Sequence, residues 1–165
     1  MWDGVGIQGC HNCDVNTAFR RGEDPWGVAR LATGTVRLAR TQYHRGMTYF
    51  IAERCVAELH ELPRQERDAH LAEMADVAAA IWRAFGPRKL NYEALGNTVP
   101  HLHWWLVPRH GDDPRPRRPI WEDLDFLQAQ WTGGCVPDDP ERERLRDALR
   151  GALQAEGAPV LQWYR

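Results

Sequence analysis

The chain has 165 residues, of which 43% are hydrophobic and 27% charged, a composition typical of one globular domain with a single core. The formal net charge is -2, and basic residues alternate with acidic ones except around Arg115, Arg117 and Arg118. This distribution argues against a general nucleic-acid groove. No apolar run approaches the ~20 residues needed to cross a bilayer, and the first residues lack the pattern of a secretory signal. We therefore expect a cytoplasmic protein without a membrane span.

Alternating apolar and polar residues predict four strands, two before and two after a long helix. The strands are expected at residues 35–40, 47–52, 89–95 and 100–107, with a turn at Gly96-Asn97 joining the last two. The segment 108–119 is rich in proline, arginine and aspartate and should be a loop. Strand pairs separated by a helix favour an α+β fold over a βαβ array.

Two segments have helical periodicity. In residues 63–85 apolar side chains recur at steps of three and four, and Gly86-Pro87 ends the pattern. A second helix is expected to begin at Asp138-Asp139-Pro140, which supplies a capping carboxylate and an early proline, and to end at Gly157.

The four cysteines are more typical of thiols or metal ligands than of disulfides in a chain of this kind. Cys10 and Cys13 form a Cys-x-x-Cys pair, and Cys55 follows about forty residues later. Two thiolates at this spacing can bind one zinc ion, and structural zinc takes four nitrogen or sulfur ligands. The alternative is a set of ordinary reduced cysteines, as we expect for Cys135.

A His-x-His pattern stands in the last predicted strand. Alternation would place His101, His103 and Trp105 on one face, and would turn Leu102, Trp104 and Leu106 toward the core. Backbone N–H groups and the Asn97 and Thr98 side chains of the preceding turn could donate to an anion. A neutral imidazole attacks phosphorus well and leaves well when protonated, so the pattern suits phosphoryl or nucleotidyl transfer. The alternative is two polar residues on an ordinary strand.

The segment 91–109, Asn-Tyr-Glu-Ala-Leu-Gly-Asn-Thr-Val-Pro-His-Leu-His-Trp-Trp-Leu-Val-Pro-Arg, resembles the active-site strand of the histidine-triad (HIT) family, particularly its bacterial branch. The likeness extends to residues 43–55 and to the Cys10-His11-Asn12-Cys13 motif, and covers about residues 10–118. It implies a homodimer with a HIT-like α+β fold, in which an antiparallel sheet of about five strands carries one long helix. Residues 1–165 would form a single domain, with its core at about 10–118 and a C-terminal helical extension at 119–165.

The resemblance also implies roles for individual residues. His103 stands at the position that attacks a nucleoside α-phosphate and forms a nucleotidyl-histidine, and water or another acceptor then resolves this intermediate. The metal positions of zinc-bearing members would be Cys10, Cys13, Cys55 and His101 here, a structural Cys₃His zinc site in which Cys55 replaces the more usual histidine. His11 and His60 are reserve ligands. The substrate would be held by residues on and around the last strand pair: Asn91, Asn97, Thr98, Trp105 and Arg109.

One departure from the family pattern changes the expected chemistry. Trp105 occupies the position of the third histidine, and an indole cannot exchange a proton at neutral pH. Hydrolysis, phosphorolysis and transfer to another acceptor all stay open, as does a non-catalytic nucleotide-binding protein; a pure assembly platform has the least support. For Arg109 a surface salt bridge is an alternative, and we expect His44, His70 and His110 to be surface or loop residues.

Overall fold

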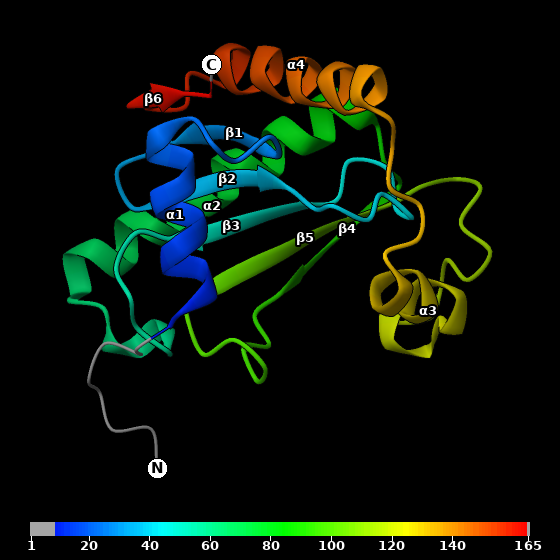
Figure 1. The fold of residues 1–165 in the computed structure, drawn as a ribbon, viewed down its shortest axis with the longest axis horizontal. Coiled ribbons are helices and arrows are strands. Elements are labelled where there is room, and N and C mark those ends of the chain that lie inside the picture. Colours follow the sequence, from blue (N-terminus) through cyan, green and yellow to red (C-terminus); the bar gives the residue numbers. More distant parts are fainter. Residues whose placement is uncertain (1–8, 165) are drawn as a thin grey trace.

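The computed structural model describes residues 9–164, in which the strands form one antiparallel sheet (Figure 1). Its order is β4-β5-β3-β2-β1-β6. The strands are β1 (Gly27–Arg30), β2 (Gly34–Leu38), β3 (Thr48–Ala52), β4 (Lys89–Glu93), β5 (His103–Arg109) and β6 (Gln162–Trp163). All four predicted strands are confirmed with shifted ends, whereas β1 and β6 are too short to show a recognisable alternation in the sequence. The predicted antiparallel α+β architecture is therefore correct, with six strands rather than about five.

Both predicted helices are confirmed, as α2 (Arg64–Phe85) and α4 (Asp139–Glu156). The Asp138 side chain accepts a hydrogen bond from the Glu141 backbone N–H and caps α4, while Gly86 and Gly157 end the two helices in the left-handed region. Helix α1 (His11–Arg21) was not expected from the sequence, and α3 (Leu124–Thr132) lies in the predicted C-terminal helical extension without having been located there. Short 3₁₀ turns, η1 (Leu59–Glu61) and η2 (Ile120–Glu122), complete the elements.

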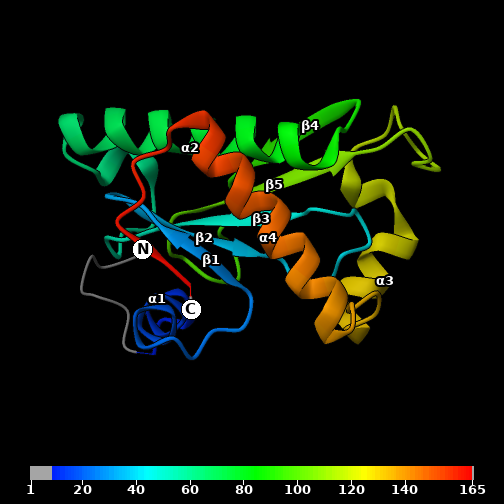
Figure 2. The same cartoon turned by 90° about the horizontal axis from the view of Figure 1, so that it is seen from above.

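The helices lie on both faces of the sheet. In Figures 1 and 2, α2 covers one face and α1 the other, while α4 packs beside α2 and over β1. Leu145, Leu149 and Leu153 of α4 are at most 1% exposed and share the main core with α2 and the sheet. Full burial of a leucine stabilises the fold by about 1.5–3 kcal/mol, so α4 is part of the main core and more than a surface addition.

Candidate active site and metal centre

Strand pairing aligns side chains in rows on the face of the sheet opposite α2. Arg37, Tyr49, Trp105 and Glu93 are direct cross-strand neighbours on β2, β3, β5 and β4. A second row contains Thr35, Ile51 and His103. Directly opposite residues of an antiparallel pair point to the same face, so the imidazole of His103 shares its face with the row that contains Trp105.

His103 is the first residue of β5, and its ring orientation is set by a backbone carbonyl. Its Nδ1 lies 2.6 Å from the carbonyl oxygen of His101. A carbonyl only accepts, so Nδ1 carries the proton and Nε2 keeps the lone pair. Burial lowers the pKa of His103, partly opposed by this hydrogen bond. The ring is therefore neutral near pH 7, in the tautomer that a nucleophile requires.

The segment between β4 and β5 is longer than the predicted turn, because the strand that was expected from residue 100 begins at His103. The Leu102 backbone bonds to Val56 and Ala52, and the backbone N–H of His101 bonds to Val99. Proline at position 100 has no N–H to offer a strand ladder. The expectation that His101 stands beside His103 on a strand is therefore wrong, since His101 lies in a bend before it.

Asn97 lies near His103, as expected, because both line one pocket between the η1 segment and the 94–102 loop. Gly96 and the apolar side chains of Leu59 and Leu95 form part of the pocket wall. Thr98 is an exposed neighbour of Asn97 in the same loop. A loop amide beside an imidazole on a strand is an arrangement that can hold a phosphate oxygen within reach of the nucleophile.

Asn91 and Arg109 lie near the opposite end of the strand pair, so the structure does not bring them to His103. Arg109 is 3% exposed and donates to the Asp113 carboxylate and to the carbonyl oxygens of Arg115 and Arg118. A further donor reaches the Asn91 side chain at 3.2 Å. The Arg109 guanidinium thus fixes the loop after β5. The salt bridge considered from the sequence is present, with Asp113, but it is buried rather than at the surface.

Trp105 packs against Tyr49, with ring centroids 5.5 Å apart and planes inclined by 53°. Burial raises the pKa of Tyr49 to about 12, so its hydroxyl stays protonated at any physiological pH. These two aromatic rings form the middle of the row beside His103. They provide apolar surface but no group that titrates near neutral pH.

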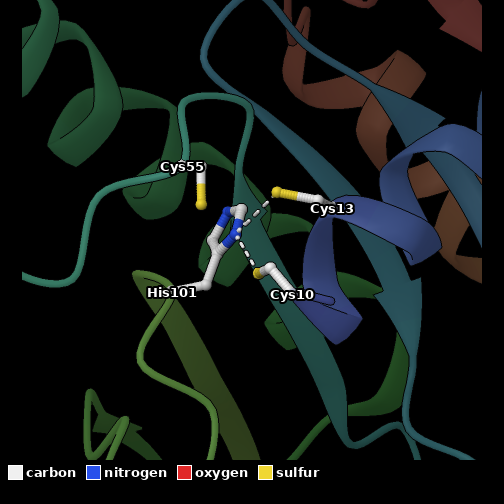
Figure 3. A group of neighbouring side chains, drawn as sticks. All are labelled: Cys10, Cys13, Cys55 and His101. Atoms are coloured by element: carbon white, nitrogen blue, oxygen red, sulfur yellow. Dashed lines mark hydrogen bonds between the residues drawn. The ribbon is translucent and has the colours of Figure 1, made fainter. Parts of the chain in front are cut away.

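The four proposed metal ligands do come together. One ligand atom from each of Cys10, Cys13, Cys55 and His101 lies within 4.8 Å of the others, and Figure 3 shows the three sulfur atoms around the imidazole. The Nδ1 atom of His101 is 3.2 Å from Cys10 Sγ and 3.5 Å from Cys13 Sγ. Three sulfurs and one imidazole nitrogen are a donor set that suits tetrahedral zinc. The reserve ligands His11 and His60 are exposed and lie outside this cluster.

Groups around the cluster orient its ligands. His101 Nε2 donates to the carbonyl oxygen of Ala52 at 2.8 Å, which leaves Nδ1 free to bind a cation. The buried Asn16 side chain of α1 donates to the same carbonyl at 2.9 Å. Burial, followed by the neighbouring thiols, raises the pKa of Cys13 to about 12. A divalent cation removes this penalty because it stabilises thiolates. The helix α1, and with it Asn16, was missed from the sequence.

Two of the histidines expected to be surface or loop residues are buried, although His44 does lie in a loop, between β2 and β3. His70 is 0% and His44 is 4% exposed, and burial lowers the pKa of each to about 4. His70 lies on the sheet-facing side of α2, where it stacks on Phe50 and accepts a hydrogen bond from the Trp104 indole N–H. His44 packs against Tyr43 and Phe126. His110, as expected, lies in the loop after β5.

The chain resembles known proteins both in sequence and in fold. Residues 40–112 match the family model described as HIT domain. A histidine triad protein from Bradyrhizobium japonicum superposes with a TM-score of 0.66 at 24% identity, covering 81% of this chain and 94% of that one. A zinc-bound histidine triad family protein from Mycobacterium smegmatis gives 0.64 at 21% identity, covering 92% and 98%. A hypothetical histidine triad nucleotide-binding protein from Sulfolobus tokodaii gives 0.65 at 15% identity, covering 87% and 93%.

Residues 40–112 therefore resemble a HIT domain in sequence, and the chain has the HIT-like α+β fold. The matched segment contains Cys55, His101 and His103, whereas Cys10 and Cys13 lie before it. Comparison with curated protein sequences gave no match. Among residues 9–164, none of the helices combines the length and the apolar character that a membrane crossing demands.

Proposed function

We propose that this protein is a nucleotide hydrolase or nucleotidyltransferase that acts at a nucleoside α-phosphate through a covalent bond to His103. The observation that carries the proposal is the tautomer of His103. Its Nδ1–H is bound to the His101 carbonyl, so the lone pair on Nε2 is available to phosphorus. The resemblance of residues 40–112 to a HIT domain supports the same class of chemistry.

In the proposed reaction, the α-phosphate lies in front of His103, where Asn97 and Thr98 donate to its oxygens. The Nε2 lone pair of His103 forms a P–N bond while the bond to the leaving group breaks. The His101 carbonyl accepts the Nδ1–H hydrogen bond throughout and stabilises the positive charge that develops on the imidazole. Water or another acceptor then attacks phosphorus, and the P–N bond breaks to restore the free ring.

A zinc ion fits the Cys₃His cluster and would have a structural role. When bound, zinc supplies the positive charge that holds three thiolates and one imidazole in fixed positions. Cys10 and Cys13 begin α1, Cys55 follows β3, and His101 precedes β5, so the four ligands would join three parts of the chain. Because the His101 carbonyl binds His103, holding His101 in place also holds the nucleophile.

The test is to trap the covalent intermediate. Protein is mixed with a panel of nucleoside 5′-phosphate esters, and intact mass is measured within seconds. We expect a gain equal to one nucleoside monophosphate, absent in His103→Ala and present in His110→Ala, which changes a loop histidine of the same type. No gain with any ester in the panel would refute the proposal.

A second candidate is a nucleotide-binding protein without turnover, which the indole at position 105 favours. Trp105 stands where a third histidine would exchange protons, and neither Trp105 nor Tyr49 titrates near neutral pH. This candidate predicts calorimetric binding of nucleotides together with identical product formation by wild type and His103→Asn, both at background level.

We further propose a cytoplasmic homodimer whose ligand is a small nucleotide. The three thiol ligands support a reducing compartment. Strand β4 is an edge of the sheet, and large apolar side chains of β4, the following loop and α2 are about half exposed: Tyr92, Leu95 and Trp82. An exposed edge beside apolar side chains is suited to pairing with a second copy. Light scattering would show twice the mass of one chain, and Tyr92→Glu should reduce it to one.

A further inference from the structure

Glu93 stands directly across from Trp105 at the last residue of β4. The register pairs Glu93 with Trp105 and Asn91 with Val107, so the Glu93 side chain points to the same face as Trp105 and His103. His103 is its diagonal neighbour, two residues along β5. Diagonal neighbours are roughly 7–8 Å apart, a gap that a phosphate bonded to His103 could fill. The Glu93 carboxyl group therefore lies beside Trp105, which stands where the family pattern has its third histidine.

The environment of Glu93 is unusual for a surface glutamate. Its side chain is partly buried, and Oε2 is buried without a hydrogen-bond partner among residues 9–164. A carboxylate oxygen left in this condition costs free energy, which a protonated form or a bound ligand relieves. Burial raises the pKa of Glu93, and the charge of Arg109 opposes part of this rise.

We propose that Glu93 is the acid–base residue of this site and exchanges the protons that Trp105 cannot. The inference rests on the proposed function, because it needs a phosphate held by His103. A general acid or base must come within hydrogen-bond reach of the reacting oxygen, and its pKa should approach the working pH. A partly buried carboxyl group diagonal to His103, on the same face of the sheet, is placed where it could reach an oxygen of that phosphate.

The proton balance of the two steps is complete with this residue. In the first step the P–N bond to His103 forms, the P–O bond breaks with its electron pair on the leaving oxygen, and the Glu93 carboxyl gives that oxygen its proton. In the second step the Glu93 carboxylate takes a proton from water, or from an acceptor hydroxyl, as its oxygen attacks phosphorus. The P–N electron pair returns to Nε2, and both residues regain their starting forms.

Few other charged groups surround Glu93 on this face. Arg109 and His103 belong to β5, and Lys89 shares the face on β4. Arg37 of β2 ends the row of Glu93 and Trp105, beyond Tyr49. From the segment packed beyond Arg109, the Asp113 carboxylate pairs with that guanidinium, and Arg115 and Arg118 bind it only through their carbonyls. His103 is thus the other group on this face whose ordinary pKa lies near neutrality.

The experiment compares two leaving groups in four proteins. The substrates are nucleoside 5′-(phenyl phosphates), whose leaving oxygen needs a proton, and nucleoside 5′-(4-nitrophenyl phosphates), whose leaving oxygen does not. The proteins are wild type, Glu93→Gln, Trp105→His with Glu93→Gln, and Glu143→Gln, which neutralises an exposed glutamate of α4. Rates of phenol release and of adduct formation at His103 are measured from pH 5 to 9.

We expect Glu93→Gln to slow phenol release about 100-fold and to change nitrophenol release less than about threefold. The high-pH decline of the wild-type phenol profile should vanish, Trp105→His should restore part of the lost rate, and Glu143→Gln should match wild type. Equal losses with both leaving groups would indicate a merely structural role and overturn the inference, as would an unchanged rate with the phenyl ester. If wild type forms no adduct even with nitrophenyl esters, the proposed function fails as well, so the two failures are distinguishable.

Discussion

Protonation of the buried His70 should destabilise the fold at acidic pH. Its ring is 0% exposed, with Nδ1 3.1 Å from the Thr33 hydroxyl and Nε2 accepting from the Trp104 indole at 3.1 Å. A second proton would have to go on Nε2, where it would meet the indole N–H, and two donors would then face each other. The perturbation we propose is His70→Gln, which keeps a polar side chain of similar reach and removes the titration.

The magnitude follows from the pKa difference between the folded and unfolded chain. Burial lowers the pKa of His70 to about 4, against about 6.5 in an unfolded chain. As pH falls through 6.5, the unfolded chain gains a proton that the folded chain does not take up until about pH 4. The free energy of unfolding should therefore fall across this window, by about 3 kcal/mol in total.

The assay is urea unfolding, followed by tryptophan fluorescence, at several pH values between 7.5 and 4. Wild type should lose about 3 kcal/mol more than His70→Gln over this range, and the two curves should run parallel above pH 7. His44 and the metal ligands titrate in both proteins, so the difference isolates position 70. If the free energies of unfolding of the two proteins ran parallel down to pH 4, the argument would be refuted. If they diverged toward high pH instead, the assigned direction of the pKa shift of His70 would be wrong.

Three further predictions concern the metal cluster, the core and the buried ion pair. Cys13→Ser should lower bound zinc below half an equivalent per chain by elemental analysis, whereas Cys135→Ser should leave it unchanged; equal zinc in both would exclude the cluster as the site. Leu149→Ala should reduce the free energy of unfolding by about 2–5 kcal/mol, and a loss under 1 kcal/mol would mean that α4 is not part of the core. Arg109→Met leaves the Asp113 carboxylate, whose side chain is 1% exposed, buried without its partner. Arg109→Met should lower the free energy of unfolding by about 3–5 kcal/mol, yet the protein that remains folded should still form the His103 adduct. Loss of the adduct in that folded protein would place Arg109 in the active site.

Much of the site could be inferred from short segments because few kinds of site explain the residue patterns found there. The spacing of Cys10 and Cys13 admits one shared metal ion, and the His-x-His pattern beside Asn97 indicated where a nucleophile could stand. Helices α2 and α4 carry complete periodicity with caps and glycine ends, so local sequence was enough to place them. The HIT-like sheet followed from the resemblance of residues 91–109.

Helix α1 and the burial of two histidines depend on contacts between distant parts of the chain, which a short stretch of sequence does not reveal. Helix α1 has a polar sequence, and it is held by buried contacts such as the bond from Asn16 to the Ala52 carbonyl. The burial of His44 and His70 is decided by the elements that pack on them. Alternation predicted one strand face for both motif histidines, but the chain before His103 bonds to the loop after β3 instead.

The sequence by itself determined which chemical groups this protein carries and in what order. It placed an imidazole at position 103, thiols before and after the first strands, and an indole at position 105. The tertiary structure alone decided the neighbours of these groups. The tautomer of His103 depends on the carbonyl of His101, whose imidazole lies against Cys10 and Cys13 from far earlier in the chain. The nearness of Glu93 to Trp105 depends on strand register. Both are long-range contacts, and long-range contacts exist only once the chain has packed.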